Sequence, residues 1–147
     1  MKAFYSIVIF SVLFAVCMAK LTPEQRRELE AKLLSECKGP SGATDDDVKG
    51  LREHEVPKTT TGKCLLSCSQ EKLGILVDGK LSIDGLKALG AKKHEGNDKA
   101  IATFNEIVAE CENISDSDAC ELGAKLMECM LNGAVKRGID PKEGIQD

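Results

Sequence analysis

Apolar side chains recur every three or four residues along most of the chain after residue 20, with charged residues between them. Such spacing places the apolar side chains on one face of an α-helix. Residues that favour helix N-caps precede these stretches, and we expect helices to begin at Thr22, at Thr44, among Thr59 to Thr61, at Ser82, at Asn97, and at Ser115 or Ser117. The pattern therefore predicts an all-α fold.

Glycine and proline predict where these helices end. Gly39 and Pro40 follow a first helix that is expected to end near Cys37. The later stop signals are Pro57 after Glu55, Gly74, and the run from Gly133 to Gly138. The least helical stretch is 75–81, where an Asp-Gly pair predicts a turn.

The N-terminus has the features of a secretory signal peptide. A predominantly apolar run, Ile7–Val16, follows Lys2 and is followed by the small or modest side chains of Cys17, Met18 and Ala19. This run is shorter than the roughly 20 residues that span a bilayer, so we expect cleavage after Ala19 and no stable membrane insertion. Residues 1–19 are thus the expected signal peptide, and residues 20–147 form one secreted, extracellular domain.

An even number of cysteines remains after the leader, which is typical of a disulfide framework in an exported protein. They are Cys37, Cys64, Cys68, Cys111, Cys120 and Cys129. Cys120 and Cys129 would lie about 13 Å apart on opposite sides of one helix, and Cys64 and Cys68 would project side by side, so neither pair can bond. About ten of the fifteen possible connectivities remain. The gaps between the cysteines do not match paired C-x2-C zinc clusters, and we expect no metal.

Charge and composition exclude several functions. The formal net charge of −4 becomes −5 when Lys2 is removed with the leader, which argues against nucleic acid or an anionic membrane as partner. Phe104 is the only aromatic residue of the mature chain, so base-stacking surfaces and aromatic cages cannot form. The two histidines, His54 and His94, lie in no recognisable catalytic motif. We therefore expect neither an enzyme nor a bound cofactor.

The cysteine spacing C-x26-C-x3-C-x42-C-x8-C-x8-C, together with the helical pattern and the turn near residue 78, resembles the insect odorant-binding proteins of the pheromone-binding and general odorant-binding type. The resemblance covers the whole mature chain. It implies a compact bundle of about six helices, with an internal apolar pocket and three interhelical disulfides, which would be Cys37–Cys68, Cys64–Cys120 and Cys111–Cys129.

The function that this resemblance implies is transport by binding. Such a carrier would take small hydrophobic molecules, such as odorants, pheromones or similar aliphatic semiochemicals, through aqueous fluid to receptors. A small hydrophobic ligand is the expected partner, an olfactory receptor is a further candidate, and both a monomer and a weak homodimer are open. The alternative is a secreted disulfide-rich helical effector or toxin that acts through its surface and has a filled core.

The apolar faces of the predicted helices and the turn supply the candidate pocket wall. The candidate residues are Leu76, Leu86, Leu89, Phe104, Val108, Leu126, Met127 and Met130. An aliphatic wall with flexible methionines predicts broad selectivity. Periodicity alone does not separate a pocket wall from an ordinary packed core.

Three further features keep two interpretations each. His54 and His94 lie among Glu and Lys, and we expect both to be exposed, with pH-gated ligand release as the alternative. Asn113, Ile114 and Ser115 form an N-glycosylation acceptor at a crowded helix junction, where modification stays open. The tail 139–147 either closes the pocket or frays.

Overall fold

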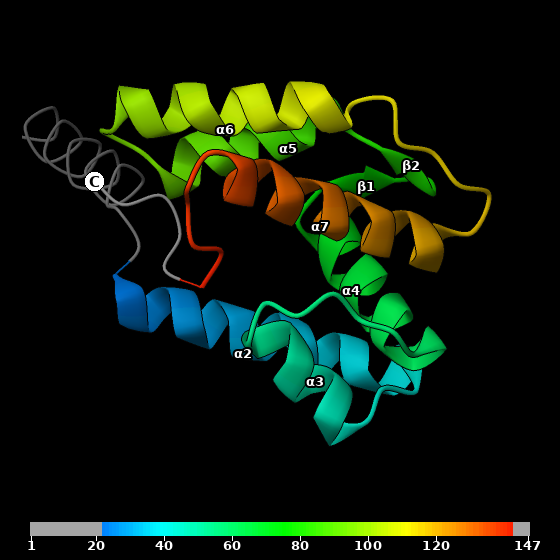
Figure 1. The fold of residues 1–147 in the computed structure, drawn as a ribbon. Coiled ribbons are helices and arrows are strands. Elements are labelled where there is room, and N and C mark those ends of the chain that lie inside the picture. The colour runs from blue at the N-terminus through cyan, green and yellow to red at the C-terminus, as the bar shows by residue number, and fades with distance from the viewer. Residues whose placement is uncertain (1–21, 143–147) are drawn as a thin grey trace, which may run out of the picture. The chain divides into compact units, whose positions relative to one another are not determined.

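The computed structural model describes residues 22–142, which contain six helices and one two-stranded hairpin (Figure 1). The elements are α2 (Pro23–Ser41), α3 (Asp45–Arg52), α4 (Thr60–Lys72), β1 (Leu76–Val77), β2 (Lys80–Leu81), α5 (Ile83–Lys93), α6 (Asp98–Cys111) and α7 (Ala119–Lys136). The expected all-α fold is confirmed. The expected signal peptide 1–19 and the tail residues 143–147 lie outside the described residues.

The chain divides into two compact units, Met1–Glu30 and Ala31–Asp147. The described part of the first unit is the beginning of α2. Here the Gln25 backbone N–H donates to Thr22 Oγ1 at 3.1 Å, and the Thr22 N–H donates to Gln25 Oε1 at 2.9 Å. This reciprocal pair is a capping box, and it lies at Thr22, where the sequence predicts that the helix begins. Residues 22–30 are all exposed.

The first helix ends later than the sequence predicts. Gly39 and Pro40 lie inside α2, which continues to Ser41, so the expected stop near Cys37 is wrong. Pro40 occupies the last turn, where its missing N–H removes only one helical hydrogen bond. The Ser41 hydroxyl donates to the Cys37 carbonyl at 2.7 Å, and Gly42, with φ of +69°, turns the chain out of the helix.

Most other helices begin where local capping chemistry places them. Thr44, Thr59, Ser82 and Asn97 are the N-caps of α3, α4, α5 and α6, and each side chain accepts a backbone N–H of the first turn. The last helix differs. Its N-cap is Asp118, not Ser115 or Ser117, and the Asp118 carboxylate accepts the N–H groups of the second and third helical residues.

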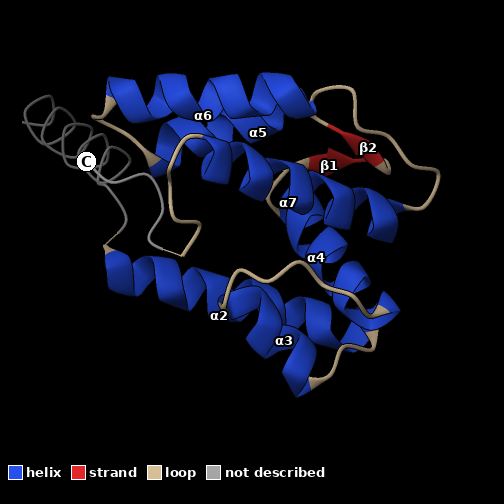
Figure 2. Cartoon of the chain, in the orientation of Figure 1, coloured by secondary structure: helices blue, strands red, loops and turns tan. Residues whose placement is uncertain are grey.

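The turn at 75–81 forms a short antiparallel hairpin, in which Leu76 pairs with Leu81 (Figure 2). Asp78 and Gly79 both have positive φ, as a two-residue hairpin turn with the twist of the strands requires. Leu76 is buried and Val77 is exposed, so the hairpin presents one side to the interior.

Two hydrophobic clusters lie within the second unit. The first, here called the upper cluster, consists of buried Ile75, Leu86, Val108, Cys111 and Leu126. The second, here called the lower cluster, consists of buried Leu34, Cys37, Ala43 and Leu65. Between them α4 packs against α7, where Leu122 is 1% exposed. No helix within residues 22–142 is long and apolar enough to cross a membrane.

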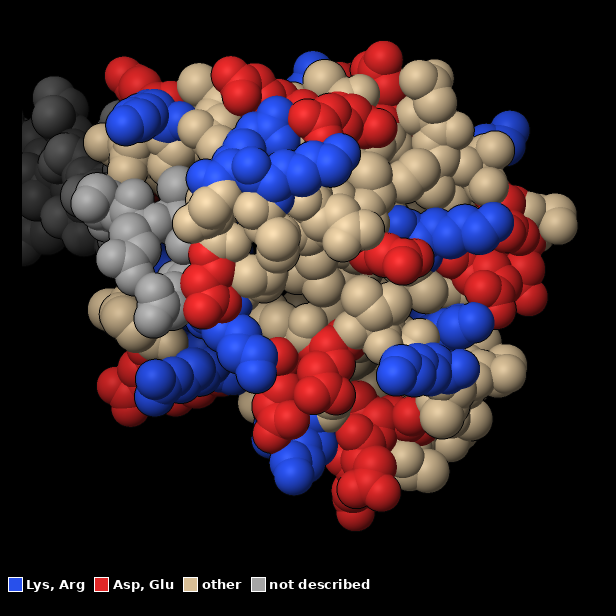
Figure 3. Space-filling model, in the orientation of Figure 1, with Lys and Arg blue, Asp and Glu red and all other residues tan. Residues whose placement is uncertain are grey.

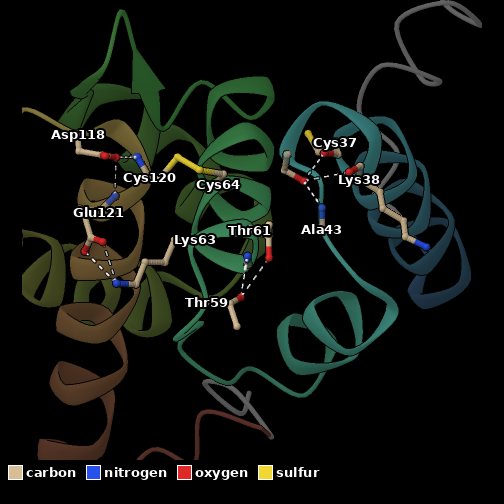
Figure 4. Close-up of a disulfide and its surroundings, with 12 residues drawn as sticks. Cys37, Lys38, Ala43, Thr59, Thr61, Lys63, Cys64, Asp118, Cys120 and Glu121 are labelled. Atoms are coloured by element: carbon tan, nitrogen blue, oxygen red, sulfur yellow. Dashed lines mark hydrogen bonds and ion pairs between the residues drawn. A yellow bond between two sulfur atoms is a disulfide. The ribbon is translucent and has the colours of Figure 1, made fainter.

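Three disulfides join the helices of this unit. They are Cys37–Cys68 between α2 and α4, Cys64–Cys120 between α4 and α7, and Cys111–Cys129 between α6 and α7, with Cα–Cα distances of 5.7, 4.4 and 6.0 Å. These are the pairs that the family resemblance implies. Figure 4 shows Cys64–Cys120 beside the ion pair in which Lys63 Nζ donates to Glu121 Oε1 at 2.8 Å. The covalent bond and the ion pair both fix α4 against α7.

Candidate ligand-binding site

The upper cluster brings together six of the eight residues expected to line a pocket. Leu86, Val108 and Leu126 are among its buried members, and Leu89, Phe104 and Met130 pack against it while partly buried. They come from α5, α6 and α7, which pack in the order α5, α6, α7. The remaining two are Leu76, which is 1% exposed on β1, and Met127, which is half-buried on α7.

A glycine allows α5 to lie close to α6. A Cβ atom built on Gly90 would lie 2.2 Å from Cδ1 of Phe104, far inside van der Waals contact. The Phe104 ring therefore lies directly over the backbone of α5 at this residue. Any larger residue at position 90 would force the ring of Phe104 to move.

A second glycine and a disulfide set the distance between α6 and α7. A Cβ on Gly133 would lie 2.6 Å from Cγ2 of Ile107, and Cys111–Cys129 joins the same two helices. Near the end of α7, Arg137 Nη2 lies 2.7 Å from Glu110 Oε1, and the hydrogen bond from Arg137 lowers the pKa of Glu110. These contacts hold the two helices that carry Val108 and Leu126.

One histidine lies in the interior, contrary to expectation. His94 is 8% exposed, and its ring centroid lies 5.9 Å from that of Phe104, with the planes tilted by 48°. His54 is exposed, as expected. His94 lies four residues after Gly90 and eight after Leu86, and all three residues are buried. This helical spacing indicates the face on which His94 lies better than its charged neighbours in sequence do. Ligand release controlled by pH stays a prediction, and His94 is the histidine that contacts a predicted wall residue.

Besides Cys111 and Cys129, five residues that the candidate wall did not include belong to the upper cluster or pack against it. They are Leu73, Ile75, Leu81, Ile83 and Ile114. Ile83 belongs to the same helical stripe as Leu86 and Leu89, so the spacing of apolar residues in the sequence already indicates that it lies on the same face. Ile114 lies in an irregular loop, where no periodicity indicates burial. Loop residues of this kind are identified only once the fold is known.

Two pockets formed by described residues open to the surface, and none of the eight candidate residues lines either one. One, of about 570 Å³, lies between the α6–α7 loop and the exposed side of α7. The other, of about 450 Å³, lies between α3 and the segment leading to α4. Figure 3 shows acidic and basic side chains interspersed over the visible face, with acidic groups gathered over the region of α3. Both pockets include charged residues, unlike the aliphatic upper cluster.

The Asp47 carboxylate, which borders the second pocket, has a structural role. The Asp47 carboxylate accepts hydrogen bonds from the hydroxyl groups of Thr59 and Thr61 and from the Thr44 backbone N–H. These donors stabilise the charged form and lower the pKa of Asp47 from 3.8 to about 2, with the bond from Thr59 as the largest cause. The carboxylate therefore ties α3 to the beginning of α4.

No cluster of three or more metal-ligating side chains occurs among residues 22–142. The side chains that the upper cluster brings together are apolar, apart from the neighbouring imidazole of His94. An arrangement of this kind can bury an apolar molecule.

Comparison with known proteins identifies one family. The family model described as PBP/GOBP matches residues 18–133, which includes all six cysteines of the disulfides. The chain is also 34% identical to the general odorant-binding protein 19d of Drosophila melanogaster over 131 residues, or 85% of each chain.

Solved structures show the same fold. The odorant-binding protein dmelOBP28a of Drosophila melanogaster superposes with a TM-score of 0.71 at 24% identity, over 80% of this chain and 98% of the other. The fatty acid binding protein OBP56a from the oral disk of the blowfly Phormia regina superposes with a TM-score of 0.59 at 26% identity, over 80% and 98% of the two chains.

Proposed function

Because this chain belongs to the PBP/GOBP family, we propose that it is a secreted carrier, which binds small hydrophobic molecules in an internal apolar pocket and transports them through an aqueous fluid to a receptor. The observation that supports this proposal is the upper cluster, where aliphatic residues from three helices and the segment before the hairpin converge. We place the pocket wall at the eight candidate residues of the sequence analysis and add Ile75 and Ile83.

The chemistry of this wall favours an aliphatic ligand. Phe104 is its only ring, and Met127 and Met130 supply flexible, polarisable side chains that adapt to different chain lengths. The blowfly relative is named a fatty acid binding protein, which supports the same ligand class. We therefore propose broad selectivity among aliphatic alcohols, esters, acids and terpenes.

The expected affinity follows from buried area. A ligand that buries on the order of 300 Å² of apolar surface gains about 7 kcal/mol at about 25 cal/mol per Å². This gain alone corresponds to a dissociation constant of about 10 μM, and the loss of translational and rotational freedom weakens binding, so we expect values from about ten to several hundred micromolar. Such affinity allows both uptake from fluid and release at a receptor, and it needs no covalent step.

Displacement of a fluorescent probe tests the proposal. The mature chain lacks Trp and Tyr, so an extrinsic probe, 1-anilinonaphthalene-8-sulfonate, is titrated into the oxidised protein and then displaced by alcohols, esters, fatty acids and terpenes. We expect saturable uptake and displacement at micromolar concentrations by several of these ligands. Absence of saturable uptake would favour the alternative, a surface-acting effector with a filled core.

A matched pair of substitutions separates a hollow cluster from a filled one. Leu126 of the upper cluster is 2% exposed and Leu65 of the lower cluster is 0% exposed, and both lie on helices. In a hollow upper cluster, Leu126→Phe should fit with little loss of stability and weaken probe binding about tenfold, equivalent to about 1.4 kcal/mol. Leu65→Phe should overpack a filled core at a cost of about 1–3 kcal/mol and leave probe affinity unchanged.

Equal destabilisation by both substitutions, with no change in probe binding, would contradict the internal pocket. The measurements are urea unfolding followed by circular dichroism and probe titration of each folded variant.

A further inference from the structure

The loop between α6 and α7 carries a motif that ligand transport does not use. Asn113, Ile114 and Ser115 form the acceptor sequence Asn-x-Ser, with a residue other than proline in the middle. In Figure 1 this loop, drawn in yellow, runs beyond the ends of α6 and α7. Asn113 lies in a turn, two residues after Cys111, which is the last residue of α6.

The three residues of the motif have different environments. Ile114 is half-buried, packs against the upper cluster and donates its N–H to the Cys111 carbonyl at 3.2 Å, so it anchors the loop. Asn113 and Ser115 on either side are exposed. Within residues 22–142, the side chains of Asn113 and Ser115 make no hydrogen bond, so the fold does not need the asparagine amide.

The surface next to Asn113 has room for a sugar. The pocket of about 570 Å³ is bordered by Asn113 and Ser115 on the loop and by polar side chains of α7, including Glu128 and Asn132. Ile114 and Cys129 add apolar surface to the same pocket. A pyranose ring presents hydroxyl groups together with C–H faces, and this mixture of polar and apolar groups can contact both.

We propose that Asn113 is an N-glycosylation site of the exported protein. The donor is an oligosaccharide linked to a lipid pyrophosphate. The Asn113 side-chain nitrogen forms a bond to C1 of the first N-acetylglucosamine and loses a proton, while the bond from C1 to the pyrophosphate oxygen breaks and the lipid pyrophosphate leaves. Ser115 supplies the hydroxyl that makes the asparagine an acceptor. The modification is independent of ligand binding and requires only that residues 1–19 direct export.

A glycan at this position is compatible with the fold. It would extend from an exposed loop, and bulky N-linked sugars occupy such surface positions. The six predicted wall residues in the upper cluster are contributed by α5, α6 and α7, outside the loop. Ligand binding should therefore be the same with and without the sugar.

The test uses the full chain expressed in insect cells, with the intact mass and glycopeptides of the secreted protein measured by mass spectrometry. Wild type should carry a mass increase that maps to Asn113. Asn113→Gln and Ser115→Ala should lose it completely, and Ser115→Thr should keep it because threonine also completes the motif.

Asn132 provides an internal control. It borders the same pocket, but the residues that follow it are Gly133 and Ala134, so it is not in an acceptor sequence. Asn132→Gln should keep the full mass increase. Secreted wild type without a sugar, or a sugar that survives Asn113→Gln, would overturn the proposal. So would wild type found only inside the cells, because the leader would then not export the chain.

Discussion

Replacing Gly85 by alanine tests the closest approach of any atom to a glycine among residues 22–142. Gly85 lies in the first turn of α5, and a Cβ built on it would lie 1.9 Å from the carbonyl oxygen of Gly74. Ordinary contacts begin at 3.4 Å, so α5 and the turn at Gly74 would have to separate by about 1.5 Å. The blocking atom belongs to the backbone. It cannot rotate away as the end of a flexible side chain can.

The expected loss of stability comes from two opposing terms. Forcing an atom into a packed contact costs about 1–3 kcal/mol, and alanine in place of glycine in a helix gains about 1 kcal/mol. The turn is held by hydrogen bonds of the Gly74 and Ile75 N–H groups to α4, at 3.0 and 2.9 Å, so we place the cost near the upper end. Gly85→Ala should therefore lower the free energy of unfolding by about 2 kcal/mol.

The same displacement should reach the proposed pocket. Leu86 follows Gly85 directly and is 4% exposed in the upper cluster, and Leu89 lies one turn further along α5. A shift of α5 would move both residues, so Gly85→Ala should also weaken probe binding. The free energy of unfolding is measured by urea titration with circular dichroism and intact disulfides, and the affinity by probe titration.

Gly50→Ala is the matched control. Gly50 lies in α3, and a Cβ built on it would meet only Glu55 Oε2 at 3.7 Å, an ordinary contact. This substitution should raise stability by about 0.5–1 kcal/mol and leave probe binding unchanged. If Gly85→Ala were stabilising to the same extent, α5 would not lie against the Gly74 carbonyl and the reasoning would fail.

Two further predictions concern cross-links and pH. Replacing Cys64 and Cys120 by serine opens a 56-residue loop and should cost about 4 kcal/mol of stability in urea unfolding. The same replacement of Cys111 and Cys129, which close an 18-residue loop, should cost about 3 kcal/mol, and the reverse order would contradict the chain-entropy account. The pKa of Asp47 is lowered in the folded state to about 2, so its contribution to stability is present above about pH 4 and is lost as the pH falls towards 2. The thermal midpoint of wild type should fall more steeply over this window than that of Asp47→Asn, and parallel curves would disprove a role for this carboxylate.

Helix starts were predictable because capping is local chemistry. The side chains of Thr44, Ser82 and Asn97 bond to N–H groups within their own first turns, and the sequence alone contains both partners. The start of α7 was not predictable in the same way. Several capping residues lie close together there. Asp116 Oδ1 accepts the Asp118 N–H at 2.8 Å, and Asp116 Oδ2 pairs with Lys125 Nζ at 2.6 Å, a contact nine residues along the chain.

Helix ends and burial depend on contacts that are distant in sequence. Pro40 favoured a stop, yet Cys37 and Leu34 are buried in the lower cluster, and this packing outweighs the single hydrogen bond that a proline in the last turn removes. The burial of His94 also depends on a contact that is distant in sequence. Its neighbours in sequence are charged, but its place over the buried side of α5 brings it to Phe104.

The proposed pocket depends on a distinction that periodicity cannot make. Leu34 and Leu65 are buried residues of helices, as are Leu86 and Leu126. The first pair nevertheless lies in the lower cluster beside Cys37–Cys68, and the second pair lies in the upper cluster. A sequence pattern reports that a side chain is buried, whereas the helix that it faces decides which cluster it joins. A disulfide joins two helices at each cluster, Cys37–Cys68 at the lower and Cys111–Cys129 at the upper, so the cross-links do not distinguish the two clusters. The longer α5, α6 and α7 surround the upper cluster, and ligand uptake should therefore change the exchange of amide hydrogens in these helices and not in α3.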